Sequence, residues 1–170
     1  MSALSLLIDL GNTRLKWVLA TDAELVNAPS AIAWPGIDLP WAEWNAAGVA
    51  QIVLASVAGT SMTARLIDAI RDRMNVPLRQ AKTQSQWLGL TGAYPMPERL
   101  GVDRWLGLIA AYRSNPGQRC LVVSAGTALT VDVLDPGGQH RGGLIAPGLA
   151  AMREGLIAAA PALAAYREGE

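Results

Sequence analysis

The fold is organised around the stretch Leu6-Leu7-Ile8-Asp9-Leu10-Gly11-Asn12-Thr13-Arg14. An apolar run enters a short turn and a second apolar run follows, which predicts a buried strand at residues 4–8 and a returning strand at residues 14–20. Asp9 is expected at the exit of the first strand, beside backbone N–H groups of the turn. Such a turn can hold phosphate, and the carboxylate can hold a metal ion with its water shell. An ordinary hairpin with a polar turn explains the same pattern, so this stretch alone does not decide its function.

The composition limits the classes of protein to which the chain can belong. It has 170 residues, a net charge of zero, 51% apolar residues and one cysteine. This length can bury the core of one domain or of two small ones, and no apolar run reaches the ~20 residues that span a bilayer. Scattered Lys and Arg argue against nucleic-acid or membrane partners, and no signal peptide is expected. We expect a cytoplasmic α/β protein in which Cys120 is a buried, inert thiol.

The first half of the chain alternates predicted strands with predicted helices. Strands are expected at residues 25–34, 51–57 and 76–78, and the β-branched run 51–57 is typical of a central buried strand. Helices are expected at residues 41–47, ending at Gly48, and from an N-cap at Ser61 to residue 74. Leu66, Ile67 and Ile70 supply the apolar face of the second helix. With the antiparallel hairpin, this order predicts an α/β fold with a mixed sheet.

The second half begins with a long stretch rich in Gly and Pro, residues 83–101, of a kind that is usually functional or disordered. A helix from Asp103 to about Tyr112 follows, and the turn at residues 114–117 stops it. Strands are expected at residues 120–123 and 129–134, a turn at 135–138 and a helix at 149–160. We place the domain boundary at the turn after the first of these helices, which gives domains of residues 1–115 and 116–170.

A weak internal repeat links the two halves. Residues 6–12 align without a gap on residues 121–127, and each copy carries an apolar strand, a small polar or acidic residue and then a glycine. The separation is too long for a solenoid and would indicate a duplicated domain. Two glycine turns facing one cleft could grip a polyphosphate, with Arg14 or Lys16 adding charge. Chance similarity between two short apolar strands explains the same alignment.

Four motifs in this chain resemble, in the same order, those of the type III pantothenate kinases, a family of the acetate and sugar kinase/Hsp70/actin superfamily. The motifs are IDLGNTRLK at residues 8–16, PERLGVDRW at 97–105, GTALTVD at 126–132 and GGLIAPG at 142–148. In the family these are the first phosphate motif, the substrate and catalytic motif, the second phosphate motif and the adenosine motif. The resemblance implies an actin-like (ribonuclease H-like) fold of duplicated domains with mixed sheets.

The family implies ATP-dependent phosphorylation of pantothenate, the first step of coenzyme A synthesis, with Mg²⁺ accompanying ATP. In this chemistry a primary hydroxyl attacks the γ-phosphoryl group and a carboxylate takes the hydroxyl proton. By resemblance that catalytic carboxylate is Asp103. Without the motif, Asp103 would be read as a carboxylate interacting with the dipole of a helix N-terminus. A homodimer is also implied.

The remaining site residues follow from the same resemblance. Asp9 would hold Mg²⁺ through water, and Arg104 would hold the pantothenate carboxylate with its planar fork of donors. A solvated helix charge is the alternative for Arg104, and simple loop packing is the alternative for Tyr94. The residues implied in ATP binding are Asp9, Leu10, Gly11, Asn12, Thr13, Arg14, Leu15, Lys16, Gly126 and Thr127. Those implied in pantothenate binding are Tyr94, Gly101, Val102, Asp103 and Arg104.

Two features depart from the family pattern. Ser124 stands where many members carry an aspartate associated with a monovalent cation, K⁺ or NH₄⁺. Because a serine hydroxyl is neutral, the cation requirement stays open. The chain is also shorter than family members, so the second domain would be incomplete. A fragment, a truncated gene product and a divergent short form all explain this length.

Two other functions compete with a pantothenate kinase. One is a catalytically silent actin-like module that binds nucleotide or regulates transcription, which the shortened second domain favours. The other is a sugar or acetate kinase of the same superfamily, against which the sequence Gly101-Val102-Asp103-Arg104 argues. The presence of Asp9, Asp103 and Arg104 together favours an enzymatic ancestor.

Overall fold

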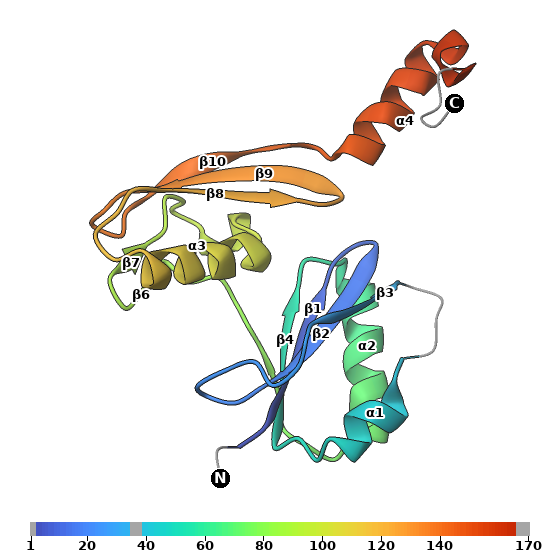
Figure 1. The fold of residues 1–170 in the computed structure, drawn as a ribbon, viewed down its shortest axis with the longest axis vertical. Coiled ribbons are helices and arrows are strands. Elements are labelled where there is room, and N and C mark those ends of the chain that lie inside the picture. Colours follow the sequence, from blue (N-terminus) through green and yellow to red (C-terminus); the bar gives the residue numbers. More distant parts are fainter. Residues whose placement is uncertain (1–2, 35–38, 166–170) are drawn as a thin grey trace. The chain divides into compact units, whose positions relative to one another are not determined.

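The computed structural model describes residues 3–34 and 39–165. The described residues form two compact units (Figure 1). Unit 1 contains the described residues up to Thr83 together with Gly101–Asp103, and unit 2 contains Gln84–Leu100 and the described residues from Arg104 onward. Among the described residues, no helix has both the length and the apolar character that a membrane crossing needs.

Unit 1 is built on a mixed five-stranded sheet with the order β3-β2-β1-β4-β5. The hairpin β1–β2 is antiparallel, whereas β4 is parallel to β1 and β5 is parallel to β4. This confirms the predicted hairpin and the mixed sheet, although β3 is shorter than expected and β5 begins two residues later than expected. The strands are β1 (Ser5–Leu10), β2 (Arg14–Ala20), β3 (Ser30–Ala33), β4 (Gln51–Ser56) and β5 (Leu78–Gln80).

The helices of unit 1 are α1 (Trp41–Ala46) and α2 (Thr60–Arg73). The predicted N-cap at Ser61 is wrong, because the cap of α2 is Gly59 and makes no side-chain cap hydrogen bond. The backbone N–H of Thr63 donates to the carbonyl of Gly59 at 3.0 Å, which places Ser61 inside the first turn. The apolar face of α2 is as predicted, with Leu66 and Ile70 fully buried.

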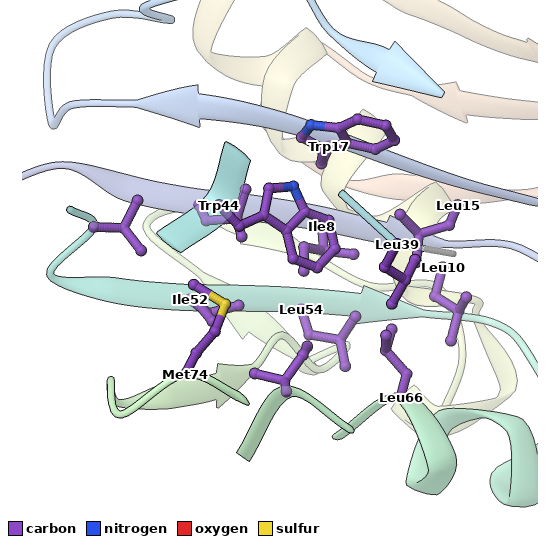
Figure 2. Close-up of a cluster of buried hydrophobic side chains, with 13 residues drawn as sticks. Ile8, Leu10, Leu15, Trp17, Leu39, Trp44, Ile52, Leu54, Leu66 and Met74 are labelled. Carbon is purple, nitrogen blue, oxygen red and sulfur yellow. The ribbon is translucent and has the colours of Figure 1, made fainter. Parts of the chain in front are cut away.

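The core of unit 1 lies between one face of the β1–β2 hairpin and the helices (Figure 2). Ile8 and Leu10 come from β1, Ile52 and Leu54 from β4, and Leu66 from α2. Trp17 and Trp44 pack edge to face, with ring centroids 5.9 Å apart. Burial of this many large apolar side chains fixes the register of β1 and β2, because a slip of one residue would turn every core side chain to the opposite face.

Unit 2 begins with a hairpin inside the stretch that was expected to be irregular. Strands β6 (Gln86–Trp87) and β7 (Leu90–Thr91) are joined by Leu88 and Gly89, both with positive φ. A 3-10 turn, η1 (Pro97–Arg99), and helix α3 (Val102–Ser114) follow. The remaining elements are β8 (Cys120–Ala125), β9 (Ala128–Leu134), β10 (His140–Pro147), α4 (Leu149–Ala159) and η2 (Pro161–Ala165).

The second sheet has three antiparallel strands in the order β10-β9-β8. Trp105 and Leu108 of α3 form a core with Leu134 of β9 on one face of this sheet. On β8, Leu121 is 65% exposed and Val123 is 55% exposed, so the other side of this strand is not covered by described residues. Cys120 is half-buried and not buried as predicted, because β8 is an edge strand.

The two halves of the predicted repeat form hairpins of the same kind. Strands β1 and β8 have equal length and lie at the aligned positions, and each begins a meander, β1-β2-β3 in one unit and β8-β9-β10 in the other. The closing pair is Leu10 with Leu15 in the first hairpin and Ala125 with Leu129 in the second. The second connection is therefore one residue shorter than the first.

The division into compact units does not fall at the turn of residues 114–117. Helix α3 precedes that turn, yet Trp105 and Leu108 pack into the core of unit 2 because they cover the face of the second sheet. The assignment of residues 1–115 and 116–170 to two actin-like domains stays a prediction.

Candidate active site

The first phosphate motif lies at the β1–β2 turn of unit 1. Asp9 and Lys16 are cross-strand neighbours, and the Lys16 ammonium donates to the Asp9 carboxylate at 3.0 Å. Both side chains are substantially exposed, at 40% for Asp9 and 55% for Lys16. An exposed ion pair of this kind contributes ~0–1 kcal/mol to stability, so either partner can exchange it for another charged group at little cost.

A backbone hydrogen bond closes the turn between β1 and β2. The Gly11 N–H donates to the carbonyl of Arg14 at 3.0 Å, so this amide closes the turn and does not point at a ligand. Leu10 and Leu15 are fully buried and belong to the hydrophobic core. Asn12, Thr13 and Arg14 are exposed. The side chains that can reach a phosphate are therefore those of the turn and of Lys16, whereas Leu10 and Leu15 position the backbone.

The donor set around Asp9 fits a metal ion that is shared with a nucleotide. No group of three or more His, Cys, Asp or Glu residues that could hold a metal ion occurs among the described residues. Mg²⁺ is commonly held by one or two carboxylates together with water and substrate phosphates, and not by an all-protein cage. One exposed carboxylate beside a polar turn is consistent with that mode of binding.

The predicted substrate and catalytic motif is divided between the two units, because Gly101–Asp103 belong to unit 1 and Arg104 belongs to unit 2. Asp103 is exposed and lies in the first turn of α3, while Val102 beside it is buried. A Cβ atom at Gly101 would lie 2.5 Å from Oδ1 of Asp103. The Asp103 carboxylate therefore packs against Gly101, and a side chain at that position would displace it.

Arg104 makes a buried ion pair with Asp132 of β9. Its Nε donates to Oδ2 at 2.8 Å and its Nη2 donates to Oδ1 at 2.6 Å. The side chains of Arg104 and Asp132 are 6% and 2% exposed, which rules out a solvated helix charge for Arg104. Hydrogen bonding to Asp132 raises the pKa of the Arg104 guanidinium, and this outweighs burial, which lowers it.

His140 and Tyr94 extend this cluster. His140 is the one histidine of the sequence, is fully buried, and places Nε2 2.9 Å from Oδ1 of Asp132. The backbone N–H of Ala93 donates to Nδ1 at 3.4 Å. The rings of Tyr94 and His140 pack edge to face at 5.7 Å, and hydrogen bonding by Tyr94 also raises the pKa of Arg104. Tyr94 and Arg104, both predicted to bind substrate, are thus brought together.

The glycines of residues 142–148 allow close packing between motifs. A Cβ at Gly143 would lie 2.3 Å from Oδ1 of Asp132 and 2.6 Å from Nη2 of Arg104. A Cβ at Gly148 would lie 2.0 Å from the carbonyl oxygen of Gly126. Because no side chain fits at either position, one glycine lets the backbone approach the buried ion pair and the other lets it approach the second turn.

The second phosphate motif repeats the hydrogen bonding of the first. The Gly126 N–H donates to the carbonyl of Ala128 at 3.0 Å, and the Gly148 N–H donates to the carbonyl of Thr127, also at 3.0 Å. Gly126, Thr127 and Ser124 are exposed. Ser124 pairs with Thr130 across the hairpin and is not part of an acidic cluster among the described residues.

Sequence reasoning missed Asp132 and His140 as parts of the site. The alternation of β9 held a signal, since Thr130, Asp132 and Leu134 share one face and are all buried. A carboxylate on the inward face of a strand needs a cationic or hydrogen-bonding partner. The identity of that partner was not readable, because Arg104 lies 28 residues away in the sequence.

Known proteins resemble this chain along nearly its whole length, including all of these motifs. The family model described as type III pantothenate kinase matches residues 5–168. A type III pantothenate kinase from Burkholderia thailandensis is 37% identical over 165 residues, which covers 92% of this chain and 60% of that protein. One from Burkholderia cenocepacia is 38% identical over 161 residues, with the same coverage of 92% and 60%. The chain therefore spans about 60% of the length of the curated relatives it matches.

Solved structures support the fold alone. A Ppx/GppA family member from Aquifex aeolicus has a TM-score of 0.51 at 15% identity, with 91% of this chain and 54% of that chain covered. The type II variant of the Aquifex aeolicus Ppx/GppA phosphatase also has a TM-score of 0.51, at 12% identity, with 90% and 55% covered. These neighbours are actin-like, which confirms the predicted fold class.

Proposed function

Since the chain belongs to the type III pantothenate kinase family, we propose that it carries the ATP- and pantothenate-binding part of an enzyme that phosphorylates pantothenate. The product is 4'-phosphopantothenate, and the reaction opens coenzyme A synthesis. The observation that carries the proposal is the pair of consecutive residues at the start of α3, an exposed Asp103 followed by a buried and oriented Arg104. They supply a proton acceptor and a carboxylate-binding group at adjacent positions.

Asp103 is proposed as the general base. As the primary hydroxyl oxygen of pantothenate bonds to the γ-phosphorus, its proton passes to the Asp103 carboxylate and the bond from the γ-phosphorus to ADP breaks. Gly101 supports this role, because the absence of a side chain leaves room for the carboxylate beside it. A fixed proton acceptor matters here because phosphoryl transfer is catalysed mainly by positioning and charge stabilisation.

We assign ATP binding to the two glycine turns, one between β1 and β2 and the other between β8 and β9. Lys16 and Arg14 are exposed cations at the first turn, and Thr127 is an exposed hydroxyl at the second. A divalent metal, which we take to be Mg²⁺, would be held by Asp9 through water and would neutralise charge on the phosphates. When Asp9 holds the metal, Lys16 can pair with the phosphates in place of Asp9.

We assign binding of pantothenate, the phosphoryl acceptor, to Arg104 and Tyr94. The guanidinium suits a carboxylate because its planar donors match both oxygens. Val102 is buried, so its contribution to substrate binding would come from its backbone. We further propose a cytoplasmic homodimer. Light scattering of the purified chain tests the dimer, and a monomer at all concentrations would contradict it.

Release of ADP by the purified chain with Mg²⁺ and ATP, with and without pantothenate, tests the proposed function. We expect pantothenate-dependent turnover in the wild type and a loss of about 10²-fold or more in Asp103→Asn. Asp68→Asn on the exposed face of α2 is the matched control and should keep wild-type turnover.

The opposite outcome is equally informative. If the wild type and Asp103→Asn both bind ATP but release ADP at the same background rate, the kinase assignment fails for this chain. The catalytically silent nucleotide-binding module then becomes the better description.

A further inference from the structure

The buried cluster of unit 2 contains two polar side chains to which the proposed reaction assigns no role. Asp132 accepts two hydrogen bonds from Arg104, and its Oδ1 also lies 2.9 Å from Nε2 of His140. Asp132 is 1% exposed and His140 is 1% exposed. Burial of a charged carboxylate is costly unless it is fully paired, and here three hydrogen bonds from two side chains satisfy it.

The geometry of the ion pair leaves part of the guanidinium directed away from Asp132. The contacts to Asp132 use Nε and Nη2, which form one side of the planar group. A guanidinium carries five N–H donors, so donors on Nη1 lie on the edge that does not face this carboxylate. The two hydrogen bonds to Asp132 set the orientation of the whole planar group, and hence of its other edge.

His140 fixes the orientation of Asp132 in turn. Since Nδ1 accepts from the backbone N–H of Ala93, the ring proton lies on Nε2 and is donated to the carboxylate. A bulge in β10 between His140 and Gly143 brings Gly143 opposite Asp132. Gly142, inside the bulge, has a φ of +96°, which favours glycine. Bulges of this kind re-aim side chains, and this one allows both His140 and the bare backbone of Gly143 to contact Asp132.

A buried ion pair is often no more stable than apolar residues of similar volume, so this pair is weak evidence of a stabilising role. Its geometry points to a second role. Hydrogen bonds from Arg104 to Asp132 remove the rotational freedom of a long side chain before any ligand binds. A pre-oriented guanidinium loses less entropy on binding a carboxylate than a mobile one does.

We propose that Asp132 and His140 are positioning residues that hold the Arg104 guanidinium ready for the carboxylate of the acceptor substrate. The inference rests on the proposed function, because it concerns the acceptor that Arg104 binds. Asp132 and His140 act through Arg104 and make no contact with the reacting atoms. Together they would set the preference of the enzyme for an acceptor that carries a carboxylate.

The test compares pantothenate with pantothenyl alcohol, in which a hydroxymethyl group replaces the carboxylate. For Asp132→Asn we expect the ratio of kcat/KM for pantothenate to kcat/KM for the alcohol to fall by about 10-fold or more, with the KM for ATP within about 2-fold of wild type. His140→Ala should lower the ratio, and His140→Gln, which keeps a donor near the Nε2 position, should restore part of it. Asp135→Asn is the matched control, because Asp135 is paired with Arg119 and Arg141 outside this cluster.

A purely structural role predicts a different pattern. If Asp132→Asn lowers kcat/KM for both acceptors by the same factor, or changes neither, the inference is overturned. If the wild type phosphorylates neither acceptor, the proposed function fails, and calorimetric binding of the two acceptors decides the inference separately. Selective binding of pantothenate that is lost in Asp132→Asn supports it, and equal or absent binding of the two acceptors by the wild type overturns it.

Discussion

Replacement of Gly148 by alanine tests how the adenosine motif supports the second phosphate motif. The new Cβ would lie 2.0 Å from the carbonyl oxygen of Gly126 and 2.9 Å from that of Thr127. Both are backbone atoms, so the clash cannot be relieved by rotation of a side chain. The start of α4 must move away from the turn, and the hydrogen bond from the Gly148 N–H to Thr127 is then weakened.

Three contributions set the change that Gly148→Ala makes in the free energy of unfolding. Overpacking costs about 1–3 kcal/mol, and a lost backbone hydrogen bond costs about 1 kcal/mol. Alanine restricts the unfolded chain more than glycine does, which stabilises the folded state by about 0.4–1 kcal/mol. Because Gly148 has a φ of −70°, alanine adds no conformational strain there. We expect Gly148→Ala to lower the free energy of unfolding by about 1–3 kcal/mol and to weaken ATP binding.

Gly155→Ala provides a control with the opposite sign. Gly155 lies inside α4, and a Cβ there would meet nothing within 4 Å. The same substitution should therefore stabilise the helix by up to about 1 kcal/mol and leave ATP affinity unchanged. Urea unfolding followed by circular dichroism and a nucleotide titration measure both effects. A Gly148→Ala protein that is as stable as wild type, with unchanged ATP affinity, would refute the role given to this glycine.

Two further predictions concern stability. Leu66→Ala in α2 removes a fully buried side chain and should lower the free energy of unfolding by about 2–5 kcal/mol. Arg65→Ala on the exposed side of the same helix should change it by less than about 0.5 kcal/mol. Equal effects of the two substitutions in urea unfolding would contradict the assigned core. Hydrogen bonding to Arg141, supported by Arg119, lowers the pKa of Asp135. A carboxyl with a lowered folded-state pKa stabilises the fold above its unfolded-state pKa, and this stabilisation is lost as the pH falls through the folded-state pKa. Asp135→Asn should thus be less stable than wild type at neutral pH and equally stable in acid, and a difference in unfolding midpoint that persists in acid would show another origin.

The sequence determined the hairpins and helices because their patterns are local. Alternating and continuous apolar runs predicted β1, β2 and β4 within one or two residues, and helical spacing predicted the buried face of α2. The β6–β7 hairpin was missed because its strands have two residues each. Its turn contains Leu88 at a φ of +42°, a conformation that sequence propensities do not favour in leucine.

The candidate site was predictable where a motif is contiguous. Residues 101–104 were identified as the catalytic motif, and the structure supplies the environments of Asp103 and Arg104 but does not test their roles. The partners of Arg104 were not predictable, because contact between α3, β9 and β10 depends on how these elements pack. The use of the Gly11 amide to close the turn was not predictable either, since hydrogen bonds that close a turn depend on its backbone angles, and Gly11 stays a predicted ATP-binding residue.

The contact between Gly148 and residues 126–127 has a mechanical consequence. Helix α4 begins at Leu149, the residue after Gly148, and backbone touches backbone at this point without an intervening side chain. Side chains can absorb small displacements by changing rotamer, but peptide groups in contact cannot. We therefore expect a shift of the first turn of α4 to displace the loop that carries Thr127.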